Sequence, residues 1–332
     1  MNLQQRIEIL VQLGKYIQGN DEAWEAVKHR AFVRNEWFTI ENTNKAVENI
    51  ARYFLQKDLL EAWTKENNVP EICANPKIVG LVAAGNIPLV VFHDFLSIFI
   101  SGHKQRIKLS SKDDVLLPFL IQKMTEWNPE VAEFVEISEM LKNCEAYIAT
   151  GSNNSGRYFD YYFGKFPNII RRNRTSIAIL DGSETEEELL ALTSDIHDYF
   201  GLGCRNVTKI YTPKEYDFVP LVNALKSYEQ LLDNVKYKNN FDYQLAILLL
   251  NKKFYMNGGA LLLEENPTLF APLSVVHYEF YENEQSLLDE LSTNEDVQII
   301  VGHAGKAFGI SQKPSLSDYA DGVNTLAFLN AL

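Results

Sequence analysis

Residues 78–109 read IVGLVAAGNIPLVVFHDFLSIFISGHKQRIKL, and this stretch decides the fold class. Its first six residues are typical of a buried strand, and the glycine, asparagine and proline at 85–88 break the apolar run. Residues 88–101 predict a helix that begins at a proline and ends before Gly102, and residues 106–109 predict a second strand. A strand, a helix and a second strand in this order form a βαβ unit, in which the two strands run parallel.

The apolar length of residues 78–100 also raises the question of a membrane-spanning helix. The turn-forming residues at 85–88 interrupt the segment early. His93 and Asp94 would lie near the middle of the bilayer, at a cost of about a few kcal/mol. We therefore expect no membrane span and interpret the segment as part of a globular domain.

Strands and helices alternate along the rest of the chain, whereas the first 75 residues show only helical spacing of apolar residues. Strands are expected at 146–150, 176–180, 207–211, 275–280 and 297–301, and helices at 115–127, 158–162, 219–232, 243–252 and 286–291. This alternation predicts an α/β fold with a doubly wound, mostly parallel sheet, followed by a second α/β lobe. We expect a helical N-terminal segment and dinucleotide-binding domain at 1–182, a catalytic domain at 183–310 and a C-terminal tail at 311–332.

Composition and charge narrow the classes of function. The 332 residues are 46% hydrophobic and 23% charged, which is ordinary for a globular protein with large cores. The net charge of -13 argues against nucleic acid or an anionic membrane as the main partner. Cys73, Cys144 and Cys204 have unrelated spacings, so neither a disulfide framework nor a metal site is expected, and the histidines show no metal spacing. Glu8 falls where a signal peptide would need an uninterrupted apolar core, so the cytoplasm is the expected location.

Cys204 lies in the stretch FGLGCRNVTKI at residues 200–210, between an expected helix and the next strand. Ser183 and Glu186 predict a capping box for this helix, and apolar residues at spacings of three and four carry it to Gly201. A thiol at such a helix-to-strand turn is held by backbone geometry, so we interpret Cys204 as a nucleophile. The alternative is a buried structural thiol, which is the usual state of a cysteine outside disulfides.

Polar residues follow three strands of the first lobe, where ligands of open α/β sheets bind. Asn86 follows the first strand, and its side-chain amide can donate a hydrogen bond to an oxyanion. Lys108 ends the second strand, and its ammonium suits a ribose or a phosphate. Thr150, Gly151 and Ser152 follow the third strand and open a helix, where backbone N–H groups and a hydroxyl suit a pyrophosphate. Each also has a purely structural interpretation, as a turn residue, a solvated lysine or an ordinary glycine-serine turn.

The order of these motifs resembles that of the aldehyde dehydrogenase superfamily, over about residues 75–310. The motifs are residues 85–88, Lys108, residues 149–152 and residues 201–204. Within the superfamily the chain is most similar to the acyl-CoA reductases typified by the fatty-acid reductase component of bacterial bioluminescence. The resemblance implies a cofactor-binding lobe with a doubly wound sheet and a second, catalytic lobe.

The resemblance also implies a role for each matching residue. Cys204 would be the nucleophile, and Asn86 would stabilise the oxyanion together with the backbone N–H of Cys204. Lys108 would contact the cofactor, and Gly151 and Ser152 would lie beside its pyrophosphate. An acyl-CoA and a nicotinamide cofactor are then the expected partners, and self-association into a homo-oligomer is left open.

Two departures from the superfamily pattern bear on the reaction. Hydrolytic aldehyde dehydrogenases carry a glutamate general base in a stretch that here reads Arg-Arg-Asn-Arg-Thr, at residues 171–175. In the motif that binds the nicotinamide ribose, Thr268 stands in place of a glutamate. A general base accelerates such a step by about 10²- to 10⁴-fold. Without it, water should be a poor acceptor of the acyl group from Cys204, whereas the thiol of coenzyme A ionises more readily and depends less on a base. We therefore expect an acyl-CoA reductase that forms an aldehyde through a thioester on Cys204. The alternatives are an acyltransferase or thioesterase that uses Cys204 without a redox step, and a non-catalytic nucleotide-binding subunit.

The residues after Lys108 predict the cofactor. In NAD-preferring members of the superfamily an acidic residue commonly lies three residues after the lysine, where it repels a 2′-phosphate, and here that position is Ser111. Because Lys108 and the hydroxyls of Ser110 and Ser111 can meet a dianion, NADPH is the expected cofactor, with NAD as the alternative. The sequence identifies neither the length of the acyl chain nor a general acid or base.

Overall fold

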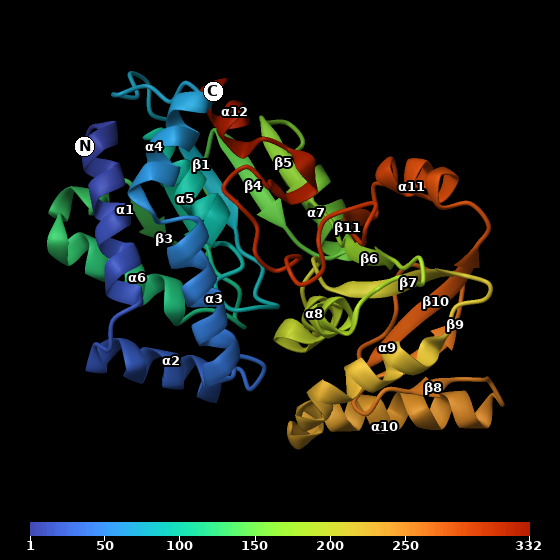
Figure 1. Cartoon of the computed structure of the whole chain (residues 1–332). Helices are drawn as coiled ribbons and strands as arrows, with labels where there is room; N and C mark the ends of the chain where they lie inside the picture. Colours follow the sequence, from blue (N-terminus) through green and yellow to red (C-terminus); the bar gives the residue numbers. More distant parts are fainter. The chain divides into compact units, whose positions relative to one another are not determined.

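The computed structural model describes all 332 residues, except that the side chain of Asn153 is not described. The chain forms two compact units, one made of Met1–Asn173 with Pro314–Leu332 and the other of Arg174–Lys313. Figure 1 labels most of the helices and strands of both units. Each unit contains its own sheet and its own hydrophobic core.

The first unit is built around a five-stranded sheet in the order β3-β2-β1-β4-β5, in which all neighbouring strands are parallel. Its strands are β1 (Ile78–Val82), β2 (Lys104–Lys108), β3 (Val135–Ile137), β4 (Ala146–Thr150) and β5 (Asn168–Arg171). Val82 pairs with Lys108 on one side and with Ala149 on the other. The carboxyl ends of β1, β2 and β4 therefore lie at one edge of the sheet.

The N-terminal helices and the sheet of the first unit share one continuous core. The helices are α1 (Leu3–Ile17), α2 (Glu22–Arg34), α3 (Ile40–Tyr53), α4 (Lys57–Glu66), α5 (Phe92–Ser101), α6 (Leu116–Trp127), α7 (Asn153–Phe163) and α12 (Thr325–Asn330), with 3-10 helices at Pro129–Glu133 and Ala320–Gly322. Gly102 ends α5 with a φ of 86°, in the left-handed conformation that glycine adopts without strain. The C-terminal α12 packs against α5, and its Leu326 and Leu329 are buried in this core.

The second unit has a six-stranded sheet in the order β11-β6-β7-β10-β9-β8, parallel except for β8, which pairs antiparallel with β9. Its strands are β6 (Thr175–Ile179), β7 (Val207–Pro213), β8 (Met256–Asn257), β9 (Leu262–Glu265), β10 (Val275–Tyr281) and β11 (Val297–Val301). Its helices are α8 (Glu186–His197), α9 (Phe218–Leu225), α10 (Val235–Leu250) and α11 (Glu284–Ser292), with 3-10 segments at Asp198–Gly201 and Lys226–Asp233.

The two faces of this second sheet carry different clusters of apolar side chains. Ala178 packs in a cluster with α8 and α9, whereas its neighbours Ile177 and Ile179 pack in a cluster with α11. This alternation follows because successive side chains of a strand point to opposite faces. Both faces of the sheet are thus buried under helices, as expected for an α/β unit.

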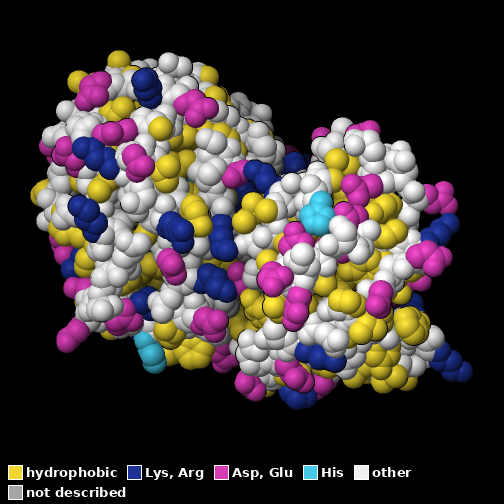
Figure 2. Space-filling view, viewed as in Figure 1, with side chains coloured by type: hydrophobic (Ala, Val, Ile, Leu, Met, Phe, Trp, Pro, Cys, Tyr) yellow, Lys and Arg dark blue, Asp and Glu magenta, His cyan; other side chains and the backbone are white. Residues whose placement is uncertain are grey.

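None of the described helices is both long and apolar enough to cross a bilayer. Residues 78–100, whose apolar length raised this question, are divided between β1, a turn and α5. On the face of the molecule that Figure 2 shows, Lys and Arg side chains are scattered among Asp and Glu.

The structure confirms the predicted α/β class, with a mostly parallel sheet in each unit. The bounds of the two units differ from the expected division at residue 182. Because β6 pairs with β7 and β11, residues from Arg174 onward belong to the second unit. Residues 314–332, expected as part of a separate tail, belong to the first unit.

Several element bounds also differ from those expected. The helix expected at 88–101 begins only at Phe92, because Leu89 has a φ of 56° and cannot continue a right-handed helix. Strands β3, β5, β8 and β9 have no counterpart among the expected elements. The strand β5 was hidden because its last residue is Arg171, a charged residue that is buried here.

Candidate functional site

Three residues that the sequence singles out lie at the carboxyl edge of the first unit's sheet. Lys108 is the last residue of β2 and is exposed, and Thr150 is the last residue of β4 and is half-buried. The pairing of both strands with β1 places their ends beside the turn that carries Asn86. One edge of the sheet therefore presents an amide, an ammonium and a hydroxyl group.

Gly151 and Ser152 form the turn from β4 into α7. Ser152 is the N-cap of α7, and its Oγ accepts a hydrogen bond from the N–H of Ser155 at 3.2 Å. A Cβ at Gly151 would lie 2.8 Å from the ring of Phe159, so a larger residue would have to displace that ring. The N–H of Gly151 donates to the carbonyl oxygen of Arg171 at 3.2 Å. A pyrophosphate would therefore meet the N–H groups at the start of α7 and not that of Gly151.

Asn86 lies in a tight turn between β1 and α5, and it is exposed. The preceding Gly85 is buried, and a Cβ there would come within 2.6 Å of the Oγ of Ser110. At the far end of the turn, the N–H of Leu89 donates to Oδ2 of Asp113 at 2.8 Å. The loop after β2 thus contacts the turn on both sides of Asn86.

The loop after β2 holds Ser110 and Ser111, the predicted contacts to a 2′-phosphate. The Oγ of the half-buried Ser110 accepts a hydrogen bond from the N–H of Lys112 at 3.2 Å, whereas Ser111 is exposed. Asp113 is only 6% exposed, and its N–H donates to the carbonyl oxygen of Ser110 at 3.0 Å. Burial raises the pKa of Asp113 to about 7, although the hydrogen bond from Leu89 lowers it. Sequence reasoning missed Asp113, because consecutive charged residues are typical of a solvated loop.

The helix before the cysteine starts later than expected. Its capping box is formed by Thr185 and Glu188, and not by Ser183 and Glu186. Ser183 instead donates its N–H and its hydroxyl to Oδ1 of Asp181, at 2.8 and 2.7 Å. The motif was present in the sequence, but it lies two residues further along.

The same helix also ends earlier than expected. α8 stops at His197 and does not reach Gly201 as an α-helix. Tyr199 and Phe200 have φ values of 55° and 59°, in the left-handed region where right-handed helices cannot continue. A short 3-10 segment therefore connects α8 to the turn that holds Cys204.

Cys204 lies in a turn that the buried Asn206 holds in place. The thiol of Cys204 is half-buried, and the backbone carbonyl oxygen accepts from the hydroxyl of Ser176 on β6 at 3.1 Å. Oδ1 of Asn206 accepts the N–H of Gly203 at 2.8 Å. Its Nδ2 lies 3.1, 3.2 and 2.9 Å from the carbonyl oxygens of Asp195, Ile196 and Asp198. One side chain thus connects the cysteine turn to the end of α8.

Asp195 connects the same end of α8 to residues 309–311. Its carboxylate accepts the N–H of Gly309 at 2.6 Å and that of Ser311 at 2.9 Å. Burial raises the pKa of Asp195, and these hydrogen bonds oppose the shift. Asn206 lies in the stretch 200–210 but received no role from the sequence, and Asp195 belongs to no predicted motif, so only the structure shows their contacts.

The stretch 171–175 holds no carboxylate, and its first two arginines are paired. Nη1 of the buried Arg171 donates to Oδ2 of Asp94 on α5 at 2.5 Å. Nη2 of Arg172 donates to Oδ2 of Asp160 on α7 at 2.6 Å. These contacts give the first two arginines a structural role within the first unit.

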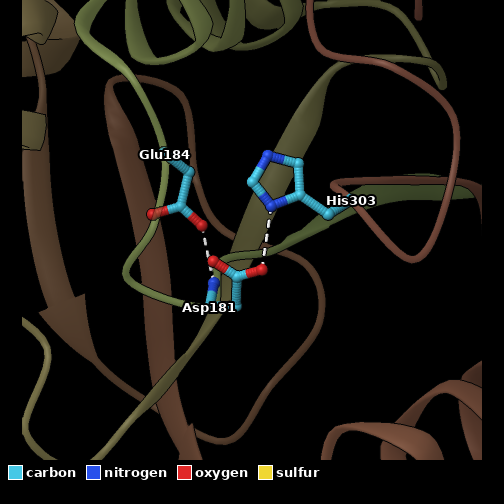
Figure 3. Close-up of side chains that lie close together, drawn as sticks. All are labelled: Asp181, Glu184 and His303. Carbon is cyan, nitrogen blue, oxygen red and sulfur yellow. Dashed lines mark hydrogen bonds and ion pairs between the residues drawn. The ribbon is translucent and has the colours of Figure 1, made fainter.

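Asp181, Glu184 and His303 lie close together after β6 and β11, as Figure 3 shows, with potential ligand atoms within 4.8 Å of one another. The two ring N–H groups of His303 donate to Oδ2 of Asp181 at 2.8 Å and to Oε1 of Glu188 at 3.0 Å. These hydrogen bonds raise the pKa of His303 to about 9. His303 thus forms an ion pair with Asp181 and Glu188, which connects the segment after β11 with the start of α8.

A cavity of about 640 Å³ opens in the second unit beside β10 and α11. Its lining includes Tyr211, Leu269, Glu279, Tyr281, Leu287 and Glu290. Burial, together with Glu279 and Glu290, raises the pKa of Tyr211 to about 12. Because carboxylates line this cavity, it does not suit the phosphates of coenzyme A or of a dinucleotide, and Cys204 is not among its lining residues.

No protein-family model matches the sequence, and no curated protein matches it. Solved structures do match the fold. Aldehyde dehydrogenase 21 from Physcomitrella patens, solved with the reaction product succinate, is 14% identical at a TM-score of 0.65, covering 91% of this chain and 74% of that one. An aldehyde dehydrogenase from Mycobacterium tuberculosis complexed with NAD+ is 13% identical at a TM-score of 0.64, covering 91% and 73%.

Betaine aldehyde dehydrogenase from Staphylococcus aureus is 12% identical at a TM-score of 0.67, covering 92% of this chain and 73% of that one. At these identities the likeness concerns the fold alone. The chain has the two-lobe α/β fold of aldehyde dehydrogenases, which confirms the fold that the motif order implied.

Proposed function

We propose that the protein is an oxidoreductase that uses a nicotinamide cofactor and reduces an acyl-CoA to the aldehyde. The observation that carries this proposal is the position of Cys204, in a turn held by Asn206 before β7, within the aldehyde dehydrogenase fold. A structure with the same fold was solved with NAD+, which supports a nicotinamide cofactor for this chain.

The edge of the first sheet offers groups that fit a nicotinamide dinucleotide. The start of α7, capped by Ser152, presents N–H groups to a pyrophosphate, and the exposed Lys108 ends a neighbouring strand of the sheet. Ser111 is exposed and uncharged at the position where an acid would repel a 2′-phosphate. These residues would hold NADPH, which supplies a hydride to the acyl carbon when it is bound.

The proposed reaction has two stages, in which Cys204 is first acylated and the aldehyde is then released. The thiolate of Cys204 attacks the carbonyl carbon of the acyl-CoA, the bond from that carbon to the sulfur of coenzyme A breaks, and coenzyme A leaves as a thiolate. After hydride addition to the thioester carbon, the thiohemiacetal anion collapses, which releases the aldehyde and restores the Cys204 thiolate. The resemblance to the superfamily implies that Asn86 and the N–H of Cys204 would stabilise the oxyanion at each stage, where loss of one donor typically costs about 3 kcal/mol.

The paired arginines favour reduction of a thioester over hydrolysis. Arg171 and Arg172 lie in the stretch where hydrolytic members of the superfamily carry their general base, and both pair with carboxylates of the first unit. Water then lacks the base that would activate it, whereas coenzyme A can leave and re-enter as a thiolate.

Mass spectrometry of the intact protein tests the nucleophile. Incubation with an acyl-CoA in the absence of nicotinamide should add one acyl mass, and Cys204→Ala should abolish the addition. Cys73→Ala and Cys144→Ala are the matched controls and should keep it. Acylation that persists in Cys204→Ala would contradict the assignment.

Oxidation of NADPH on addition of acyl-CoAs of graded length separates the candidate functions. A reductase consumes NADPH and releases aldehyde. Acylation of Cys204 without NADPH oxidation would favour an acyltransferase or thioesterase, and cofactor binding without acylation would favour a nucleotide-binding subunit.

A further inference from the structure

Asp113 connects the two turns to which the proposed function assigns its oxyanion and cofactor residues. Its Oδ2 accepts the N–H of Leu89 at 2.8 Å, three residues after Asn86. Its own N–H donates to the carbonyl oxygen of Ser110 at 3.0 Å, which closes the loop that follows β2. The two turns are 24 residues apart along the chain at this contact, so the hydrogen bond is tertiary and not part of either turn.

The N–H of Leu89 that Asp113 accepts lies where the backbone offers few other acceptors. Leu89 has a φ of 56°, in the left-handed region, and it is buried. Its N–H precedes the start of α5 at Phe92 and has no carbonyl of that helix to bond. The carboxylate of Asp113 therefore satisfies a buried donor that a strained turn would otherwise leave without an acceptor.

Close packing at the other end of the turn supports the same link. A Cβ on Gly85 would lie 2.6 Å from Oγ of Ser110 and 3.2 Å from the N of Asp113. The turn that carries Asn86 is thus fixed at both ends by one loop, on one side by van der Waals contact and on the other by a hydrogen bond. The loop and the turn are therefore in direct contact at two points.

The chemistry of Asp113 is unusual for a residue that only closes a turn. Its side chain is almost fully buried, and its Oδ1 has no hydrogen-bond partner among the described residues. Burial raises the pKa of this carboxyl to about 7, and the neighbouring Asp114 also raises it. A buried carboxyl with one oxygen unsatisfied is costly, so its acceptor function toward Leu89 has to compensate for that cost.

We propose that Asp113 is a positioning residue that couples cofactor binding on the loop after β2 to the orientation of the turn that carries Asn86. The proposal rests on the proposed function, because it takes Ser110 and Ser111 as cofactor contacts and Asn86 as the oxyanion donor. In this arrangement Ser110 and Ser111 would hold the cofactor, the loop would hold Leu89 through Asp113, and Asn86 would be kept where charge develops.

Three variants separate this role from ordinary turn closure. Asp113→Ala removes the acceptor for Leu89. Asp113→Asn keeps an oxygen acceptor of the same shape without the charge. Asp114→Ala is the matched control, because Asp114 is the next carboxylate of the same loop and pairs with Arg34 at 3.0 Å.

Hydrogen exchange over residues 84–91, the affinity for NADPH and the rate at which acyl-CoA acylates Cys204 are the three readouts. NADPH should slow exchange of this segment in the parent protein, and this protection should disappear in Asp113→Ala. The folded Asp113→Ala protein should also be acylated about 10-fold or more slowly, because small displacements of catalytic groups have large kinetic effects. Asp113→Asn and Asp114→Ala should stay within about 3-fold of the parent in all readouts.

The exchange measurement keeps the inference falsifiable even if Asp113→Ala does not fold. Absence of NADPH-dependent protection at 84–91 in a parent protein that does bind NADPH would overturn the coupling. Equal effects of Asp113→Ala and Asp114→Ala would overturn the specific role of Asp113. A parent protein that neither binds NADPH nor becomes acylated would instead overturn the proposed function and the coupling with it, while the exchange rates of Asp113→Ala would still decide whether Asp113 holds the turn.

Discussion

Replacing Asn206 by alanine should destabilise the second unit through the turn that holds Cys204. Asn206 is 0% exposed, its Oδ1 accepts from Gly203, and its Nδ2 lies within hydrogen-bond distance of three carbonyl oxygens. Its amide has two N–H groups and one carbonyl, so about three hydrogen bonds are lost. Each is worth about 1 kcal/mol net, and a buried group left unsatisfied adds about 1–3 kcal/mol, so the free energy of unfolding should fall by about 4–6 kcal/mol.

Thermal and denaturant unfolding monitored by circular dichroism measure this loss. For a unit of this size, 1 kcal/mol corresponds to about 2–4 °C in Tm, so Asn206→Ala should unfold about 10–20 °C lower than the parent. Asn206→Asp should be at least as unstable, because it keeps the acceptor for Gly203 but directs a charge at three carbonyl oxygens. The control is Asn240→Ala on α10, where a single surface bond from Nδ2 to the carbonyl oxygen of Lys236 at 2.8 Å is lost. A loss below about 1 kcal/mol for Asn206→Ala, or an equal loss in the control, would refute this reasoning.

Three further predictions concern single side chains. Asn86→Ala should reduce turnover about 10²-fold or more and leave the affinity for NADPH nearly unchanged, since the hydrogen bond from Asn86 strengthens only as charge develops on the oxyanion. Steady-state kinetics and a binding titration measure the two quantities, and a turnover within a few-fold of the parent would remove Asn86 from the mechanism. The parent should prefer NADPH over NADH by about 10-fold or more, and Ser111→Glu should weaken NADPH far more than NADH; equal dissociation constants in the parent would contradict this. The pKa of His303 is raised to about 9 by its hydrogen bonds to Asp181 and Glu188, so its stabilising effect is complete below the unfolded value of about 6.5 and disappears as the pH rises through 9. The Tm difference between the parent and His303→Ala should therefore shrink from pH 6 to pH 10, and a difference that stays constant would argue against the ion pair.

Much of the first unit could be predicted because its local signals agree with its packing. The apolar runs of β1 and β4 are buried on both faces, and Gly102 adopts the left-handed conformation that ends α5. The prediction failed where tertiary contacts override local pattern. Arg171 ends a strand although it is charged, because Asp94 neutralises it in the interior. The C-terminal segment looked like a tail, yet Leu326 joins the core of a unit whose main segment, Met1–Asn173, ends more than 150 positions earlier.

The end of α8 shows why the surroundings of Cys204 were hard to predict. Apolar residues at helical spacing continue to Phe200, and this periodicity predicts a helix up to Gly201. The backbone at Tyr199 and Phe200 is left-handed, a conformation that costs about 1–2 kcal/mol per residue. Asn206 bonds to carbonyl oxygens that an uninterrupted helix would use itself, so the early end of the helix and the side chain that stabilises it occur together.

Asn206 and Asp113 illustrate one physical reason why sequence motifs indicate candidate reacting groups but not the residues that hold them. A nucleophile or an oxyanion donor must be a particular residue type at a particular turn, so its identity is visible in the sequence. A residue that positions such a turn needs only a short polar side chain whose oxygen accepts a hydrogen bond from a backbone N–H. Asn and Asp are common in loops, so their presence in the sequence does not indicate this role. What distinguishes Asn206 and Asp113 is burial, which depends on contacts made 8 to 24 residues away. A substitution at either position should therefore alter the chemistry of Cys204 or Asn86 without touching the substrate, and the isosteric variants separate the lost hydrogen bond from lost volume.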